Sequence, residues 1–257
     1  MSGKDTQEYL DKKAFFASLI TVYGRNVVLE MLQDRTIQIH KLHMAKSNKH
    51  EGVVNRILQL ARERQIEIKE HTKEQLSRIS RNAKQDQGVA ADIIAPNYKN
   101  VKTYLENLPN SFRLLALDGI QNPQNLGMII RSAAAGNIDG IILPKKNSAK
   151  LSPLVIKASA GTLFKIDILY CDDLEEVLPG FLKEEATLYA LSSHATQTLH
   201  DLTSPPRSVF ILGNESEGVS ESITKQYNDA LSIPMNRGVE SLNVAVTAAL
   251  IAFMGNR

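Results

Sequence analysis

Three polar residues that can bind or orient a ligand, Glu240, Ser241 and Asn243, lie together near the end of the chain. They precede residues 244–254, an apolar segment whose one polar residue is Thr247. Ser241 is a suitable helix N-cap, because its hydroxyl can accept a backbone N–H of the first turn. A helix that is apolar on every side must be covered on every side, by its own domain or by a second subunit. We therefore expect a site at the start of a buried helix.

A second group of polar residues lies in residues 117–143, which have the pattern of a strand, a loop, a helix and a second strand. Asn125 stands near the start of the helix, and Arg131 follows six residues later. This separation is about 120° short of two full helical turns, so the two side chains need not share a face. Arg131 interrupts an apolar helix, which indicates either a structural carboxylate partner or a functional anion.

A third group is the loop at residues 213–220, GNESEGVS, directly after an apolar strand. Loops after the carboxyl ends of parallel strands are the usual ligand sites of open α/β sheets. Val219 occupies the place of a P-loop lysine, and Glu215 and Glu217 would repel phosphates, so a phosphate site is excluded. A glycine-bearing acidic loop suits a ligand with positive charge and no phosphate, such as S-adenosylmethionine. The alternative is an ordinary turn with solvated acids.

Two kinds of apolar periodicity divide the chain. The front part predicts a helix over residues 14–32 broken at Gly24, a strand at 37–44, helices at 55–65 and 74–79, and a strand at 89–94. Beyond residue 112, short apolar strands alternate with helices, which favours a parallel sheet with helices on both faces. These strands are expected at residues 114–117, 138–143, 165–170, 188–191, 209–212 and 231–233. We predict a flexible leader (1–13), an α/β module (14–95), a linker (96–111) and a second α/β domain (112–257).

Charge and composition narrow the class of protein. Residues 1–100 hold 17 Lys and Arg against 12 Asp and Glu, a net charge of +5, whereas residues 101–257 hold 13 against 16. A basic front half indicates an anionic partner such as RNA, or else simply solvated helix faces. The single cysteine, Cys171, excludes an internal disulfide and is predicted to be core, which fits a cytoplasmic protein. We expect no membrane span.

Two further sets of polar residues carry weaker signals. His194 and His200 flank a turn with no cysteine or acid at metal-ligand spacing, so no metal site is expected. Lys145, Lys146 and Lys150 follow a predicted strand and could contact RNA.

Taken in chain order, the three groups resemble the SpoU (TrmH) family of RNA ribose 2′-O-methyltransferases across residues 112–255. The first motif, N-x-G-x-x-x-R, corresponds to Asn125, Gly127 and Arg131. The second, L-G-N-E-x-E-G, corresponds to residues 212–218, and the third, I-P-M…V-E-S-L-N-V, to residues 233–244. The front module is similar, more loosely, to the family's ribosomal-protein-like substrate-binding domain, through Tyr23-Gly24 and Gln87-Gly88-Val89.

This resemblance implies a fold, a cofactor and roles for particular residues. The family domain is an α/β fold with a deep trefoil knot, it binds S-adenosylmethionine, and it forms a homodimer. By motif position, the cofactor would be bordered by Gly213, Ile233 and Leu242. The residues implied around the reacting ribose are Asn125, Arg131, Glu215, Ser241 and Asn243.

The resemblance is strongest to members that methylate a guanosine in 23S ribosomal RNA. A tRNA 2′-O-methyltransferase of the same family is an alternative. A non-catalytic RNA-binding protein on this fold is a second rival, although the motif residues are intact. A nucleotide-dependent enzyme is a third, opposed by the absence of a G-x-G-x-x-G after any predicted strand.

Overall fold

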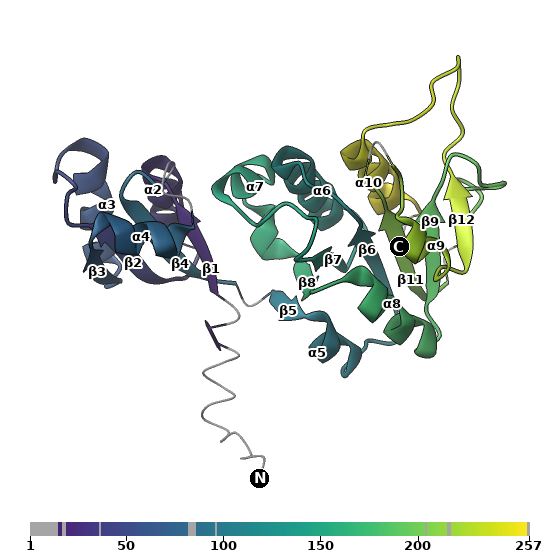
Figure 1. Ribbon diagram of the computed structural model, residues 1–257, viewed down its shortest axis with the longest axis horizontal. Helices are drawn as coiled ribbons and strands as arrows, with labels where there is room; N and C mark the ends of the chain where they lie inside the picture. The colour runs from purple at the N-terminus through teal and green to yellow at the C-terminus, as the bar shows by residue number, and fades with distance from the viewer. Residues whose placement is uncertain are drawn as a thin grey trace, which may run out of the picture. The chain divides into compact units, whose positions relative to one another are not determined.

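The computed structural model describes residues 15–16, 19–35, 37–81, 86–95, 97–203, 205–214 and 217–255. The chain divides into two compact units, residues 1–96 and 97–257 (Figure 1). The predicted leader, residues 1–13, lies outside the described residues.

The first unit is a four-stranded mixed sheet with helices. Its strands run in the order β1 (Leu19–Tyr23), β4 (Val89–Ile94), β2 (Ile39–Ala45) and β3 (Glu67–His71). The helices are α2 (Arg25–Gln33), α3 (Gly52–Glu63) and α4 (Lys73–Ser80). A capping box starts α4, because the Thr72 hydroxyl accepts the Gln75 N–H and the Gln75 side chain accepts the Thr72 N–H.

The prediction of a helix over residues 14–32 is wrong for its middle part, because residues 19–23 form strand β1. Its residues alternate between buried and partly buried, as on a sheet with two unlike faces. The stretch LITVY is rich in β-branched and aromatic side chains, which favour strands. Gly24, with a φ of 97°, then lets the chain turn into α2.

Arg64, just after α3, is the residue that ties α3 to the end of α2. Its guanidinium donates to the carbonyl oxygens of Met31 (3.2 Å), Leu32 (2.9 Å) and Asp34 (3.2 Å), and also to that of Ile37. These carbonyls include acceptors that the last turn of a helix leaves without helical partners. Arg64 is therefore structural rather than a contact for RNA.

The second unit is built on an eight-stranded sheet in which every strand pair is parallel. Its order is β10 (Gln197–Thr198), β12 (Asp229–Ser232), β9 (Thr187–Leu191), β11 (Arg207–Leu212), β6 (Phe112–Leu117), β7 (Gly140–Pro144), β8 (Asp167–Cys171) and β5 (Tyr98–Asn100). The six predicted strands and the α/β class are confirmed. Continuous buried runs such as that of β7 fit a sheet covered on both faces.

Helices cover both faces of this sheet (Figure 1). Helices α6 (Pro123–Ala135), α7 (Pro153–Ala158) and α10 (Val244–Phe253) pack against one another on one face. The opposite face carries α5 (Val101–Leu105), α8 (Leu174–Lys183) and α9 (Glu221–Thr224). The short helix η1 (Thr162–Lys165) packs against α6.

The predicted linker over residues 96–111 is wrong for residues 97–105. Strand β5 pairs with β8 at the edge of the large sheet, and α5 follows it, with Val101 fully buried. Three residues give too little periodicity to predict a strand. What holds β5 is tertiary pairing, together with the stacking of Tyr98 on Tyr170 at 4.6 Å.

Helices α6 and α10 approach closely where both end. Gly136 is the C-cap of α6, and a Cβ there would lie 2.4 Å from the carbonyl oxygen of Ala252. The Asn137 N–H donates to the same oxygen at 2.7 Å. Gly136 is therefore needed for space at this contact, and this packing sets how the start of α10 meets α6.

Candidate active site at the carboxyl edge of the large sheet

A cavity of about 470 Å³ opens where strands β9, β11 and β12 end. Its lining includes residues 190–194 at the end of β9 and beyond it, 212–214 and 217–219 at the end of β11 and beyond it, and Ile233, Met235 and residues 240–242 after β12. Because neighbouring parallel strands end at one edge, loops far apart in sequence converge there. The cavity brings together all three residues predicted to border a cofactor: Gly213, Ile233 and Leu242.

The loop after β11 is a closed hairpin that forms one wall of this cavity. The Asn214 N–H donates to the Gly218 carbonyl at 3.1 Å, and the Gly218 N–H donates back at 3.0 Å. A Cβ on Gly213 would lie 1.9 Å from the carbonyl carbon of Gly218, so only glycine fits. The Ser220 N–H donates to the Asp118 carboxylate at 2.7 Å, which holds the end of the loop against β6.

The charge of the lining is acidic. Among the described residues that line this cavity there are two carboxylates, Glu217 and Glu240, and no lysine or arginine. Carboxylates attract a cationic ligand and repel a phosphate. The structure therefore favours a ligand with positive charge, as the loop sequence predicts.

A second cavity, of about 360 Å³, adjoins the first and shares Asn214, Glu217 and Val244 with it. Its other lining residues come from the loop after β6 and the start of α6: Gly119, Ile120, Gln121, Asn122 and Asn125. Side-chain amides dominate this lining. Amides both donate and accept hydrogen bonds, so this space suits a neutral polar group such as a sugar hydroxyl or a base edge.

Asn125 and Asn243 meet between the starts of α6 and α10. The Asn243 Nδ2 donates to the Asn125 Oδ1 at 3.2 Å, while the Asn243 Oδ1 accepts the Ala245 N–H at 2.9 Å. Asn243 is therefore the N-cap of α10, and the prediction of Ser241 as N-cap is wrong. Asparagine competes for this position as well as serine does, and the helix begins two residues later than expected. Ser241 lines the larger cavity instead.

Arg131 does not lie with Asn125. Asn125 is 6% exposed, whereas Arg131 is on the exposed stripe of α6, one turn after Met128. Arg131 lines neither of the two cavities. The helical angle between positions 125 and 131 allows this separation, since the two side chains need not share a face. Glu215, the remaining predicted site residue, lies outside the described residues.

Sequence reasoning missed two parts of the site. The loop after β9 contributes Ser192, Ser193 and His194 to the larger cavity, although His194 was set aside as part of an ordinary turn. Asn214 was not singled out, yet it lines both cavities and its side chain accepts the Glu217 N–H at 2.7 Å. The position of Asn214 between the motif residues Gly213 and Glu215 was the available signal.

The lysines after β7 are engaged by acids. Lys145 pairs with Asp172 at 2.9 Å and lies 4.8 Å from the centre of the Tyr170 ring, and Lys146 pairs with Asp173 at 3.7 Å. These ion pairs compete with any phosphate, which weakens the prediction that Lys145 and Lys146 contact RNA; for Lys150 the prediction stands untested.

Cys171 is core, as predicted. It is 4% exposed, and burial together with Asp172 and Asp173 raises the pKa of its thiol to about 12. Within the described ranges, no three His, Cys, Asp or Glu side chains are grouped to hold a metal ion. In the same part of the chain, no helix is long and apolar enough to cross a membrane.

The fold and the site define an α/β protein with a ligand cavity at the carboxyl ends of parallel strands, preceded by a smaller α/β unit. The chain belongs to the SpoU rRNA methylase family, whose model matches residues 112–253. Residues 21–99 match the RNA 2′-O ribose methyltransferase substrate-binding domain. The protein is therefore an RNA methyltransferase.

Relatives match along most of the chain. The 23S rRNA (guanosine-2′-O-)-methyltransferase RlmB of Xylella fastidiosa (strain 9a5c) is 29% identical over 236 residues, covering 90% of this chain and 94% of the relative. An uncharacterized tRNA/rRNA methyltransferase of Mycobacterium avium (strain 104) is 30% identical, covering 90% of this chain and 75% of the relative.

Among solved structures, the SpoU methyltransferase AviRb from Streptomyces viridochromogenes in complex with the cofactor AdoMet is similar in fold. Its TM-score is 0.63 at 21% identity, covering 94% of this chain and 90% of that one.

Proposed function

We propose that the protein transfers a methyl group from S-adenosylmethionine to the ribose 2′-hydroxyl of a guanosine in 23S ribosomal RNA. The observation that carries the proposal is the 470 Å³ cavity at the ends of β9, β11 and β12, with two carboxylates and, among its described lining residues, no lysine or arginine. A sulfonium and an ammonium suit such a lining. The RlmB relative, matched over nearly its whole length, supports the guanosine target.

The acceptor ribose is assigned to the second, amide-lined cavity. Asn122, Asn125 and Asn214 can donate to and accept from ribose hydroxyls, and Asn214 borders both cavities. The cofactor supplies a methyl carbon already activated by its sulfonium. The protein must then align the 2′-oxygen with that carbon, and positioning of this kind supplies several kcal/mol of a barrier.

As the methyl group passes from sulfur to oxygen, the demethylated cofactor would leave and the 2′-hydroxyl would lose its proton to water. A guanidinium stays charged in proteins and has no free lone pair to accept a proton, so Arg131 is a poor base. Arg131 instead stabilises the developing negative charge on the 2′-oxygen or holds the neighbouring phosphate. Ser241, Asn243 and Glu215 belong to the same site by motif position.

A homodimer would bring Arg131 to the reaction. Arg131 shares the exposed surface of α6 with Met128, which is 42% exposed. On α10, which packs against α6, Val246, Leu250 and Phe253 are 48%, 43% and 61% exposed. A second copy that covers this apolar surface would also cover Arg131. We therefore assign Arg131 to the site of the partner subunit.

The family's trefoil knot and a cytoplasmic location are part of the same proposal. The knot would involve the segments that line the larger cavity, and an experimental structure tests it. A tRNA substrate is the alternative, and the second relative's printed name includes both tRNA and rRNA. The match to the methylase family model over residues 112–253 opposes a non-catalytic RNA-binding protein.

The first test is methyl transfer from labelled S-adenosylmethionine to unmodified 23S ribosomal RNA and, separately, to unmodified tRNA, with ribose methylation mapped. Label on one 23S guanosine supports the proposal, and label on tRNA alone selects the alternative. Cofactor binding by calorimetry without label on either RNA rejects both substrates. If the protein neither binds S-adenosylmethionine nor labels either RNA, the proposed methyl transfer is rejected.

Arg131→Ala is expected to abolish turnover while cofactor binding survives. Mixing this variant with Gly213→Ala tests the dimer assignment. A heterodimer holds one site with both an intact Arg131 and an intact cofactor loop, so the mixture should recover about a quarter of wild-type activity. No recovery would place Arg131 in the site of its own subunit.

A further inference from the structure

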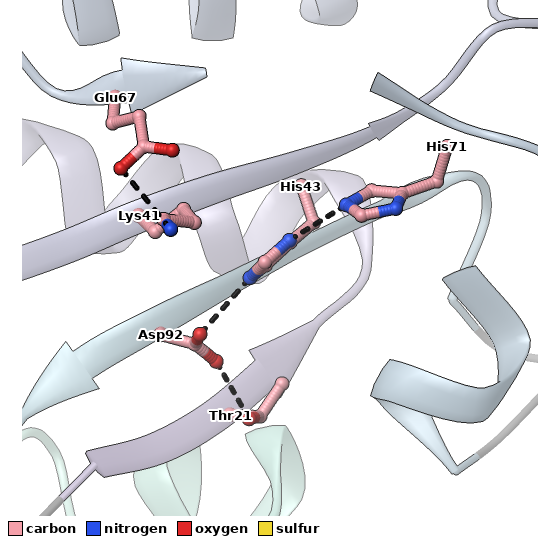
Figure 2. Close-up of polar contacts among 6 residues, drawn as sticks. All are labelled: Thr21, Lys41, His43, Glu67, His71 and Asp92. Carbon is pink, nitrogen blue, oxygen red and sulfur yellow. Dashed lines mark hydrogen bonds and ion pairs between the residues drawn. The ribbon is translucent and has the colours of Figure 1, made fainter. Parts of the chain in front are cut away.

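A continuous chain of hydrogen bonds crosses all four strands of the first unit (Figure 2). The Thr21 hydroxyl on β1 donates to the Asp92 Oδ1 on β4 at 2.7 Å. The Asp92 Oδ2 lies 2.9 Å from His43 Nε2 on β2, and His43 Nδ1 lies 2.9 Å from His71 Nε2 on β3. Each link joins one pair of adjacent strands. We name these four residues the polar ladder.

The Asp92 carboxylate determines which atom donates and which accepts in each hydrogen bond of the polar ladder. An ionised carboxylate only accepts, so Asp92 requires an N–H on His43 Nε2. His43 Nδ1 is then the acceptor in the neutral ring, and His71 Nε2 must carry the N–H that it accepts. One added proton is tolerated, because an imidazolium beside Asp92 is an ion pair. A second would put two imidazoliums 2.9 Å apart.

The two histidines of the polar ladder are buried, so solvent does little to offset the cost of a second proton. His43 is 6% exposed and His71 is 8% exposed. Helix α4 covers one end of the same sheet face, where its Leu76 packs against Ala45 and Ala90. Helix α2 packs on β1 and β4 and buries only apolar residues. A charge placed on the ladder is therefore poorly solvated.

The surrounding charges oppose protonation of His71. Burial lowers the pKa of His71 below its ordinary value, and the positive charges of His43, Lys69 and Lys41 lower it further. Burial alone would raise the pKa of Asp92, but hydrogen bonds from His43 and Thr21 bring it below its ordinary value. The remaining charges nearby are His40 on β2, Glu67 on β3, which pairs with Lys41 at 3.1 Å, and Lys73, Glu74 and Arg78 on α4.

We infer that the polar ladder is an acid-sensitive lock on strand β3, which opens when His71 takes up the second proton. β3 is an edge strand, paired only with β2 in the sheet, and His71 is its last residue. Thr72, the N-cap of α4, follows directly. Protonation of His71 therefore destabilises β3 and the start of α4 together, while the second unit stays folded.

The sign of the pH effect follows from the lowered pKa. Stability from a neutral His71 is fully present above its ordinary pKa of 6.5 and is lost as pH falls through the lower, folded value. Asp92 would contribute the same kind of loss only below its ordinary pKa of 3.8. The two groups therefore act in separate pH ranges.

The test is hydrogen exchange of the full chain, corrected for the intrinsic rate at each pH. Between about pH 6.5 and 5, protection of residues 67–71 should fall by up to about tenfold per pH unit, as uptake of one proton requires. Residues 207–212 of the second unit should not change. His71→Gln, whose amide can still donate to His43, should remove this pH dependence, and the exposed His50→Gln should keep it.

Equal loss in both units, or a loss that begins only below about pH 4, would overturn the inference. So would a His71→Gln protein that opens with acid as the wild type does. If that variant does not fold, imidazole ¹⁵N shifts of the wild type decide the matter. The inference requires His43 and His71 both protonated at Nε2 near neutral pH, and a His71 that titrates above 6.5 contradicts it.

Discussion

Gly213 and Gly218 lie in the same loop after β11 but need glycine for different reasons, which makes them a matched pair for testing the cofactor loop. A Cβ on Gly213 would lie 1.9 Å from the Gly218 carbonyl carbon, 2.0 Å from its oxygen and 2.2 Å from the Val219 nitrogen. Ordinary contacts begin at 3.4 Å, so the loop must move by more than 1 Å. Gly218 has nothing within 4 Å of such a Cβ but has a φ of +70°.

The expected losses follow from these contacts. Forcing an added methyl into a filled space costs about 1–3 kcal/mol, and the bound form of the loop bears this cost, so Gly213→Ala should weaken S-adenosylmethionine binding by about 10²-fold, or roughly 2.7 kcal/mol. Gly218→Ala introduces only the left-handed strain of an alanine, about 1–2 kcal/mol, and should weaken binding by about tenfold.

Calorimetric titration with S-adenosylmethionine measures both losses, and thermal unfolding checks that each variant is folded. Overpacking at Gly213 is expected to cost about 1–3 kcal/mol of stability, which the second unit should survive. If the Kd of Gly213→Ala for S-adenosylmethionine were within about threefold of the wild-type value, the steric argument would be refuted, because the loop would then have adapted to the added methyl group. A greater loss in Gly218→Ala than in Gly213→Ala would refute the ranking.

Three other substitutions or treatments test separate parts of the structure. Arg64→Ala should destabilise the first unit by about 2–3 kcal/mol in urea unfolding, because the carbonyls at the end of α2 lose a charged donor. Arg62→Ala, at an exposed position of α3, should change little, and equal losses would argue against the capping role. Asn243→Asp keeps the N-cap acceptor but loses the donor to Asn125, so activity should fall with little change in stability, whereas Asn243→Ala should also lose about 1 kcal/mol. If Asn243→Asp and Asn243→Ala both kept wild-type activity, the hydrogen bond between Asn243 and Asn125 would not belong to the site. Cys171 should resist iodoacetamide at about pH 8 in the folded protein and react after unfolding, because its pKa is about 12 and it is buried; rapid labelling of the folded chain would contradict that burial.

Pattern alone predicted the features that depend on local chemistry. The six strands of the second unit follow from short apolar runs, because a parallel strand covered on both faces has no polar side. The family resemblance, rather than pattern, implied that Gly213, Ile233 and Leu242 border a cofactor, and all three line one cavity. Helical geometry allows the separation of Arg131 from Asn125.

Tertiary structure decided the features that depend on contacts between distant residues. Strand β1 has apolar spacing that also fits a helix, and its pairing with β4 makes this segment a strand. Strand β5 is three residues long and exists only through its pairing with β8. His194 enters the larger cavity because β9 ends beside β11 and β12, a neighbour relation that no local pattern contains.

The polar ladder shows the same division between sequence and tertiary structure. Thr21, His43, His71 and Asp92 are ordinary residues along the chain, up to 71 positions apart. The sheet order β1-β4-β2-β3 places each beside the next, within hydrogen-bond distance. The sequence by itself determined the chemistry that each side chain could perform. Only the pairing of strands determined which side chains could perform it together, because hydrogen bonds act over about 3 Å and sequence distance carries no such information.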